Sequence, residues 1–280
     1  MTDAPRTAAG DEAAGALDGE SVPDYVARFR LDGRRHVVLG GGQGMGRQTS
    51  HALAQLGAEV AVVDVDEEVA KNVAAEIGGG AAAHVADITD ARQMERLAAE
   101  VGDVDGVVDI VGMARYTRLT ETSEEDWAWE HDMVLRHAWL AVRAFGPRLA
   151  RRGGGSMAFV ASVSGMTGAP MHGAYGVFKA GLLALVRTAA LELGPSRVRV
   201  NAVCPGTVWT PRVAAGIDRR GRDRVISATP LRRIMLPSDI ASALVFLLGD
   251  MAAGVNGHAL VVDGGATVKF PFDTDGLDQE

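Results

Sequence analysis

The chain has 280 residues, enough for one large α/β domain or two small ones, and 47% of them are hydrophobic, which is ample for a buried core. A net charge of −8 argues against a nucleic-acid-binding surface, and the lack of an apolar run of about 18 residues argues against a membrane span. The single cysteine, Cys204, excludes an internal disulfide and is typical of the reducing cytoplasm.

Residues 1–30 are expected to form a flexible N-terminal extension, with a short helix conceivable over 22–29. The first twenty residues are acidic, rich in small side chains, and lack the basic and apolar regions of a signal peptide. The apolar neighbours of Cys204 favour a core position for this residue over a role as a nucleophile.

From residue 34 onward, short apolar runs alternate with segments of helical periodicity. In chain order, the sequence predicts a strand over 36–40, a helix over 44–58, a strand over 61–65, a helix over 66–80, a strand over 82–88, a helix over 89–102, a strand over 106–111, a long helix over 122–152, a strand over 156–162, a helix over 174–194, a strand over 198–204, a helix over 238–250 and a strand over 258–265. This alternation indicates βαβ units and a Rossmann-like, doubly wound α/β fold, with a parallel sheet covered by helices on both faces. We expect one domain over 31–266 and a C-terminal extension over 267–280.

A glycine-rich loop, GGGQGMG over 40–46, lies between the first predicted strand and the first predicted helix. In that position glycines let a pyrophosphate approach the unpaired N–H groups at a helix N-terminus. By itself the loop is also compatible with a flexible turn.

Asp64 ends the second predicted strand, eighteen residues after Gly46. A carboxylate there can accept both ribose hydroxyls of an adenosine and would repel a 2′-phosphate. NAD(H) is therefore favoured over NADP(H), although Arg47 keeps NADP(H) open. Asp64 is also a candidate helix N-cap.

Ser162, Tyr175 and Lys179 form a Ser…Tyr-x-x-x-Lys pattern. Tyr175 and Lys179 share one face of the predicted helix, one turn apart. An ammonium there is expected to lower the tyrosine pKa from its usual value near ~10, so that the phenol can act as an acid or base. Ser162 could donate a hydrogen bond to a substrate oxygen. Alone, the Tyr–Lys pair is also what chance supplies on a helix surface.

Together these residues resemble the short-chain dehydrogenase/reductase family over about 34–265. The family's glycine motif appears as LGGGQGMG from Leu39, its adenine-contacting acid as Asp87, its proline-glycine segment as PGTVWT over 205–210, and its V-D-G-G as 262–265. The resemblance implies a single Rossmann-like domain with a seven-stranded parallel sheet. It also implies that Tyr175 is the general acid/base, that Lys179 assists it and binds the nicotinamide ribose, and that Ser162 polarises the substrate oxygen.

The same resemblance implies an NAD site, and no metal is expected. The implied cofactor contacts are Gly40, Gln43, Gly44, Met45, Gly46, Asp64, Asp87, Ile88, Asp109, Gly112, Tyr175, Lys179, Pro205, Gly206, Val208 and Thr210.

Three positions depart from the family pattern. Leu39 replaces a threonine, and DIVG over 109–112 replaces N-N-A-G, so that the charge of Asp109 stands where an amide is usual. Val134 occupies the position of an asparagine that holds a water in the family's proton relay. His131 and His137 lie nearby on the same predicted helix and are expected to be surface or subunit-contact residues, with a relay role as the minority alternative.

The segment 211–233 is expected to be a mobile substrate lid, whose arginines either bind an acidic group or form a solvated face. The expected pocket residues follow strand ends or flank Tyr175 or the lid: Met113, Arg115, Tyr116, Met166, His172, Trp209 and Val213. For His172, an exposed loop position is an equal alternative.

The main expectation is a cytoplasmic, NAD-dependent oxidoreductase that acts on a secondary alcohol or ketone, apolar or cyclic. The aromatic residues of 122–152 and the resemblance favour a homotetramer, or a dimer. The F-P-F of 270–272 suggests docking on a neighbouring subunit or closing a pocket, with a disordered tail as the competing interpretation, favoured for the final acidic residues. Two alternatives stay open. The chain could be a nucleotide-binding regulatory or scaffold protein with reduced catalysis, or an enzyme of this fold that catalyses a non-redox net reaction.

Overall fold

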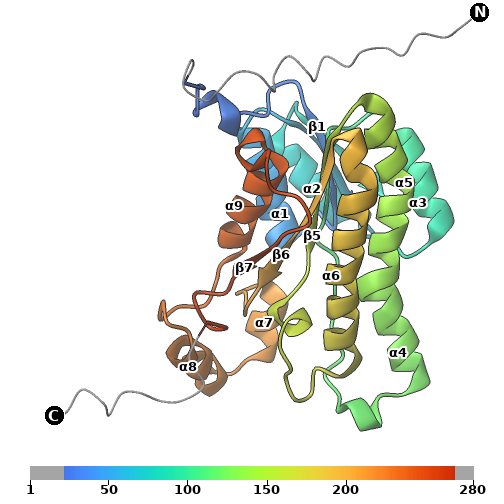
Figure 1. Ribbon diagram of the computed structural model, residues 1–280. Coiled ribbons are helices and arrows are strands. Elements are labelled where there is room, and N and C mark those ends of the chain that lie inside the picture. Colours follow the sequence, from blue (N-terminus) through green and yellow to red (C-terminus); the bar gives the residue numbers. More distant parts are fainter. Residues whose placement is uncertain (1–21, 269–280) are drawn as a thin grey trace, which may run out of the picture.

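A seven-stranded parallel sheet runs through the centre of the computed structural model, which describes residues 22–268 (Figure 1). The strands are β1 (Arg35–Leu39), β2 (Glu59–Asp64), β3 (Ala81–Val85), β4 (Gly106–Asp109), β5 (Gly155–Val160), β6 (Val198–Pro205) and β7 (Ala259–Val262). Their spatial order is β3-β2-β1-β4-β5-β6-β7. The order reverses between β1 and β4, and at such a switch point the carboxyl ends of the strands border a crevice suited to a nucleotide.

Helices cover both faces of the sheet (Figure 1). They are α1 (Gly44–Gln55), α2 (Glu67–Ile77), α3 (Ala91–Glu100), α4 (Glu124–His131), α5 (His137–Arg152), α6 (Gly173–Leu193), α7 (Pro211–Gly216), α8 (Arg219–Ala228) and α9 (Pro237–Leu248). Apolar side chains of α1, α2 and α9 form a buried core on one face, and those of α3, α5 and α6 form another on the opposite face. The predicted single-domain, doubly wound fold is therefore confirmed.

Aspartates set the starts of two helices near the nucleotide edge. The side chain of Asp66 accepts hydrogen bonds from the N–H groups of Glu68 and Val69, which begins α2. Asp90 does the same for α3. The N-cap of α2 is therefore Asp66, and Asp64 is left at the end of β2, with its side chain facing the glycine loop.

The predicted helix over 122–152 is interrupted. Between α4 and α5, residues Asp132–Arg136 form one π-helical turn. The backbone N–H of His137 reaches back five residues to the carbonyl of Asp132, so the turn is one residue wider than in an α-helix. Hydrophobic periodicity does not distinguish a π-helical turn from an α-helical one, which is why the sequence predicts a continuous helix.

The lid and the chain ends also differ in detail from the predictions. The segment 211–233 contains two short helices, α7 and α8, and β7 is shorter than the predicted strand over 258–265. Of the expected N-terminal extension, only 22–30 is described, and it contains a 3-10 turn over Ala27–Phe29. Residues 1–21 and 269–280 lie outside the described residues, and so does the F-P-F segment.

One described segment, Gly173–Ser196, is long and apolar enough to cross a membrane by length and composition. It comprises α6 and the turn after it. In the structure α6 packs on the sheet with buried residues along its length, including Leu182, Val186 and Ala190. This helix is therefore a core element of the fold.

Candidate active site

Ser162, Tyr175 and Lys179 meet at the carboxyl end of the sheet. Ser162 follows β5 directly, and its Oγ accepts a hydrogen bond from the N–H of Ser164. Tyr175 and Lys179 lie one turn apart on α6. The side chains of Ser162 and Tyr175 are hydrogen-bonded to each other, so the three residues that the spacing singled out form one cluster.

The Tyr175 side chain is partly buried. Burial raises the pKa of Tyr175 to about 12, and the hydrogen bond with Ser162 acts in the opposite direction without offsetting it. The expectation of a lowered tyrosine pKa is therefore wrong for the chain alone, because burial raises it. With a pKa of about 12, the phenol of the chain alone is protonated at neutral pH.

Lys179 is almost fully buried, at 1% exposure. Its Nζ donates a hydrogen bond of 2.7 Å to the carbonyl of Val160 and lies 5.6 Å from the centroid of the Tyr175 ring. Burial lowers the pKa of Lys179 to about 8, while the charge of Asp109 acts to raise it. The amine is thus fixed beside the tyrosine and titrates close to neutral pH.

The glycine loop is tightly folded at the start of α1. Gly40 and Gly44 have positive φ angles of 80° and 54°. A Cβ on Gly46 would lie 1.9 Å from the carbonyl oxygen of Gly40, so only glycine fits there. Gln43 is the N-cap residue of α1, and the side chain of Met45 packs in the core. This close backbone fold fits the cradle that a pyrophosphate requires.

Asp64 is tied to that loop. Its Oδ2 accepts a hydrogen bond of 3.1 Å from the N–H of Gly42, which leaves further lone pairs for a ribose. Arg47 is directed to α2, where its Nε lies 2.8 Å from Glu76 Oε2. The one arginine beside the loop therefore has an acidic partner.

The remaining predicted cofactor contacts lie at neighbouring strand ends. Asp87 is exposed, and its Oδ1 accepts two hydrogen bonds from Thr89, whereas Ile88 is buried. After β6, Gly206 packs against Asp263, where a Cβ would lie 2.9 Å away. Val208 is buried, and Thr210 caps α7 and lies close to Gly44.

Two of the positions that depart from the family pattern are packed in the core. Leu39 ends β1 without exposure, and Val134 is fully buried in the π turn against Ala174 and Phe178. The side chain of Val134 has no polar atom, so it offers a water nothing to bind.

The third departure forms an unexpected contact. Asp109 ends β4 at 2% exposure, and His137 Nε2 lies 3.3 Å from its Oδ1. His137 is itself 1% exposed, so the expectation that it is a surface or subunit-contact residue is wrong. His131 does lie nearer the surface and packs on Phe178. Gly112 approaches Lys179 so closely that a Cβ there would be 2.8 Å from Nζ.

Three of the predicted pocket residues line two separate cavities. One, of about 370 Å³, lies between the turn after Ser162 and the start of α6 and is lined by Met166 and His172. His172 is half-buried, accepts or donates a 2.7 Å hydrogen bond with Ser164 Oγ, and its ring lies 6.2 Å from that of Tyr175. Burial lowers the pKa of His172. It is therefore a partly buried residue near the tyrosine ring rather than a solvent-exposed loop histidine.

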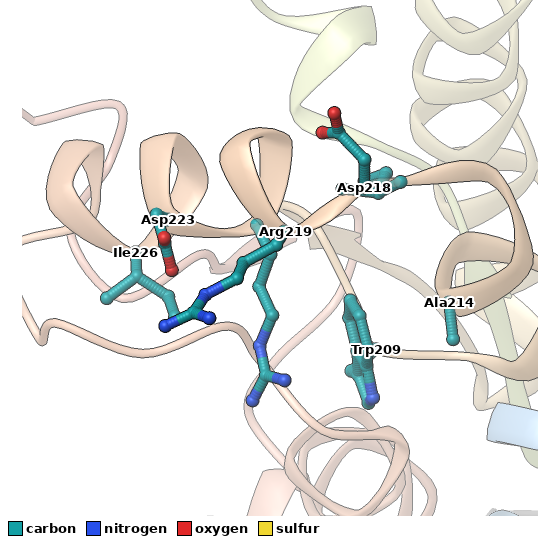
Figure 2. A pocket seen from close by; sticks show the side chains of 8 residues that line it. Trp209, Ala214, Asp218, Arg219, Asp223 and Ile226 are labelled. Atoms are coloured by element: carbon teal, nitrogen blue, oxygen red, sulfur yellow. The ribbon is translucent and has the colours of Figure 1, made fainter.

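The second cavity, of about 650 Å³, lies between α7 and α8 (Figure 2). Trp209 and Arg219 line it, and Arg222 stacks on the Trp209 ring with Cζ 4.9 Å from its centroid. The two cavities share no lining residue, so the structure does not bring Trp209 together with His172.

The other pocket candidates have different surroundings. Arg115 forms an ion pair with Asp126 and stacks on Trp129, so its charge is directed to α4. Tyr116 is exposed and packs beside His172. Met113 is partly buried after β4, and Val213 lies on α7 as the donor to the Thr210 cap.

Sequence reasoning missed Glu130, a buried acid on α4. Its carboxylate accepts hydrogen bonds from the backbone N–H groups of Arg115 and Tyr175, and burial raises its pKa. It is the one acid of α4 at an inward-facing position, and that position is the only signal that could have revealed it. Cys204, in contrast, is the core residue that its apolar neighbours predict, since burial raises the pKa of its thiol to about 11.

Comparison with known proteins supports the same site. Residues 40–267 match a family model described as enoyl-(acyl carrier protein) reductase. D-threitol dehydrogenase from Mycolicibacterium smegmatis is 36% identical over 86% of this chain and 95% of its own.

Two solved structures have a similar fold. A 7α-hydroxysteroid dehydrogenase complexed with NADH and 7-oxo glycochenodeoxycholic acid superposes with a TM-score of 0.83, 29% identity, and coverage of 86% of this chain and 96% of its own. A gluconate 5-dehydrogenase from Burkholderia cenocepacia with NADP and tartrate gives a TM-score of 0.83 at 27% identity, over 88% and 99% of the two chains.

Proposed function

Because the chain belongs to the short-chain dehydrogenase/reductase family, we propose that it is an NAD(H)-dependent oxidoreductase that interconverts a secondary alcohol and a ketone. The observation that carries the proposal is the cluster of Ser162, Tyr175 and Lys179 at the carboxyl end of the sheet, in which Ser162 and Lys179 are buried and Tyr175 is partly buried. An apolar or cyclic substrate is the favoured class, because the cavity between the turn after Ser162 and the start of α6 is lined mainly by apolar and small residues, although Tyr175 is not one of them.

In this proposal each residue of the cluster has one task. Ser162 donates a hydrogen bond to the substrate oxygen, and Tyr175 Oη takes the alcohol proton during oxidation and returns it during reduction. The Lys179 ammonium stabilises the phenolate form of Tyr175. A bound nicotinamide would accept or supply the hydride, and its positive charge when oxidised would favour the same phenolate.

We assign the adenosine half of NAD to the glycine loop and Asp64. The loop offers backbone N–H groups at the start of α1, and Asp64 Oδ2 already lies within hydrogen-bond reach of it. Preference for NAD over NADP is supported by the Asp64 carboxylate and by the pairing of Arg47 with Glu76.

The cofactor proposal is tested by fluorescence titration with NADH and NADPH. The unmodified protein is expected to bind NADH more tightly, and Asp64→Ala is expected to reduce the preference by about tenfold or more, because a like charge against the 2′-phosphate is removed. Equal affinities of the unmodified protein for the two cofactors would refute the preference.

Turnover is tested with a panel of cyclic and open-chain secondary alcohols and ketones, followed by NADH absorbance. Tyr175→Phe is expected to lower kcat by at least about 100-fold while NADH binding is retained, since only the proton-transferring hydroxyl is lost. Retained turnover would place the acid/base elsewhere. Tight NADH binding without turnover on any substrate would favour a regulatory or scaffold role, and substrate conversion without net NADH change would favour a non-redox reaction.

We further propose a cytoplasmic homo-oligomer, a tetramer or a dimer. Trp127 and Trp139 on α4 and α5, and Val177 and Leu191 on α6, are large apolar side chains with 41–80% exposure, which a second copy would cover. Light scattering coupled to size exclusion would measure the mass, and a monomer of 29.3 kDa would contradict the proposal.

A further inference from the structure

Asp109 and His137 form a buried acid–histidine pair next to the proposed catalytic lysine. Both side chains are 1–2% exposed, and Asp109 Oδ1 lies 3.3 Å from His137 Nε2. Oδ1 also accepts a hydrogen bond from the N–H of Val111. Oδ2 is buried and has no hydrogen-bond donor among residues 22–268. A carboxylate so placed needs a compensating charge or a proton, because an unpaired buried charge is strongly destabilising.

The hydrogen bond of His137 Nδ1 fixes one of its ring protons. Nδ1 is 3.0 Å from the carbonyl oxygen of Asp132, which can only accept, so Nδ1 carries a hydrogen. Nε2 then faces Asp109 either as a second N–H or as a bare lone pair that accepts a hydrogen from the carboxyl group. In both forms one proton lies between the two side chains, and the pair as a whole has no net charge.

The π turn makes this contact possible. The carbonyl of Asp132 accepts from both the backbone N–H and the ring of His137, the residue that follows the turn. The extra residue of the turn places the ring of His137 toward β4, where an uninterrupted helix would rotate it by about 100°. The irregular turn and the buried pair are therefore one feature.

Lys179 is a buried cation whose pKa responds to the charge of Asp109. Asp109 acts to raise the lysine pKa, and the segment after Asp109 returns to Nζ at Gly112. The other titratable groups around the cluster are Tyr175 on α6, Glu130 on α4 and Cys204 on β6; Asp132 and His131, at the α4 end of the π turn, lie nearer the surface. Without His137, the charge of Asp109 would have Lys179 as its only buried cationic neighbour among the described residues.

We propose that His137 is a positioning residue for Lys179: by sharing one proton with Asp109 it makes the pair neutral, so that the lysine ammonium stays on the Val160 carbonyl and the reacting groups instead of forming an ion pair with Asp109. At Asp109, where the family has an asparagine, the two side chains together then provide a pair with no net charge. The inference rests on the proposed function for its catalytic meaning, whereas the shared proton itself does not depend on catalysis.

The test is a cycle of His137→Leu, Asp109→Asn and the double variant. His137→Leu leaves Asp109 uncompensated, and we expect the Tm of the cofactor-free protein to fall by about 5 °C. In the double variant the amide introduced at position 109 carries no charge. Part of the lost Tm is therefore expected to be recovered, even though two residues have been changed. His137→Gln, whose amide can donate to Asp109, is expected to lose less than His137→Leu. His131→Leu at the end of α4, on the other side of the π turn and nearer the surface, is the matched control and is expected to change neither Tm nor turnover.

The pH dependence of turnover separates a positioning role from a purely structural one, because a purely structural role would leave it unchanged. In His137→Leu we expect kcat to fall by about tenfold. We also expect the alkaline limb of the pH–rate profile to move to higher pH, because an uncompensated Asp109 raises the pKa of Lys179 and holds the proton on it. The double variant is expected to move the profile back. A double variant no better than His137→Leu in both Tm and pH profile would overturn the proposal.

A spectroscopic arm tests the shared proton in the protein without cofactor or substrate. Long-range 1H–15N spectra, with His137→Gln used for assignment, are expected to show a hydrogen on Nδ1 at neutral pH and a change at Nε2 in Asp109→Asn. An unprotonated Nδ1 would overturn the proposal. If no substrate were found, so that the proposed function failed, this arm and the Tm cycle would still decide the question.

Discussion

At the scale of single residues, burial shifts the proton affinities of Tyr175 and Lys179 in opposite directions. The pKa of the tyrosine rises to about 12 and that of the lysine falls to about 8, so burial favours the neutral form of each. The free chain therefore holds a protonated phenol beside an amine that releases its proton easily. Under the proposed function, base catalysis by Tyr175 would then depend on the positive charge of a bound oxidised cofactor.

Glu130 contacts the backbone at the start of α6, and this contact leads to a prediction. Its carboxylate accepts from the N–H groups of both Arg115 and Tyr175. In Glu130→Gln the amide nitrogen cannot accept, so one buried N–H loses its partner. We expect the free energy of unfolding to fall by about 1–3 kcal/mol and kcat to fall with it, as measured by urea denaturation and steady-state assays.

The control for this variant is Glu125→Gln, which removes an exposed charge from the same helix. It is expected to change stability by no more than about 0.5 kcal/mol. Equal stability of Glu130→Gln and Glu125→Gln would show that Glu130 does not hold the start of α6.

The sequence predicts one half of the residue-level site and misses the other. Ser162, Tyr175 and Lys179 are close because Ser162 ends a strand and the other two share a helix face, and both conditions can be read from spacing. Glu130 and His137 reach the site only through the direction of α4 and the π turn after it. That direction depends on how helices pack on the sheet, which local periodicity does not encode.

At the scale of elements, the loop between β1 and α1 is the least tolerant described segment near the proposed cofactor. A Cβ at Gly46 would lie 1.9 Å from the Gly40 carbonyl oxygen, and backbone on both sides leaves no room for a shift. The Gly46→Ala substitution must therefore displace the turn from which the N–H groups of α1 point outward.

We expect Gly46→Ala to weaken NADH binding by at least about tenfold and to destabilise the fold by about 1–3 kcal/mol, because overpacking forces the backbone to move. Isothermal titration and thermal unfolding would measure the two effects. Gly79→Ala is the matched control, since nothing lies within 4 Å of a Cβ there. Unchanged NADH affinity in Gly46→Ala would argue that the loop does not hold the pyrophosphate.

Most elements follow from hydrophobic runs and helix signals, with shifts of a few residues at their ends. The α2 helix illustrates the limit: the sequence predicts it over 66–80, but Asp66 is its cap and Gly78, at a φ of 85°, ends it at Ile77. The break at Asp132–Arg136 and the helices of the lid, α7 and α8, were not predicted, because their geometry depends on contacts distant in sequence.

At the scale of the whole molecule, one buried histidine away from the site couples folding to pH. His36 lies in β1 at 1% exposure, and neither ring nitrogen has a hydrogen-bond partner among the described residues. It packs against Gly106 of β4, where a Cβ would lie 2.5 Å from the ring. Burial lowers the pKa of His36 to about 4.

The sign of the resulting pH dependence follows from that shift. The unfolded chain binds a proton at His36 below its ordinary value of 6.5, whereas the folded chain does so only near 4. The contribution of His36 to stability is therefore fully present above pH 6.5 and is lost progressively as the pH falls to 4. The total loss is at most about 3 kcal/mol, at 1.36 kcal/mol per pKa unit.

His36→Leu removes the titrating group, so the difference in unfolding free energy between pH 7 and pH 4 is expected to shrink by up to about 3 kcal/mol. Urea denaturation of both proteins at the two pH values measures it. His258→Leu provides the comparison, because His258 is exposed before β7 and its substitution is expected to leave the difference unchanged. If His36→Leu were as acid-sensitive as the unmodified protein, the pH dependence of folding would have to come from the carboxylate pairs at the surface instead of the centre of the sheet.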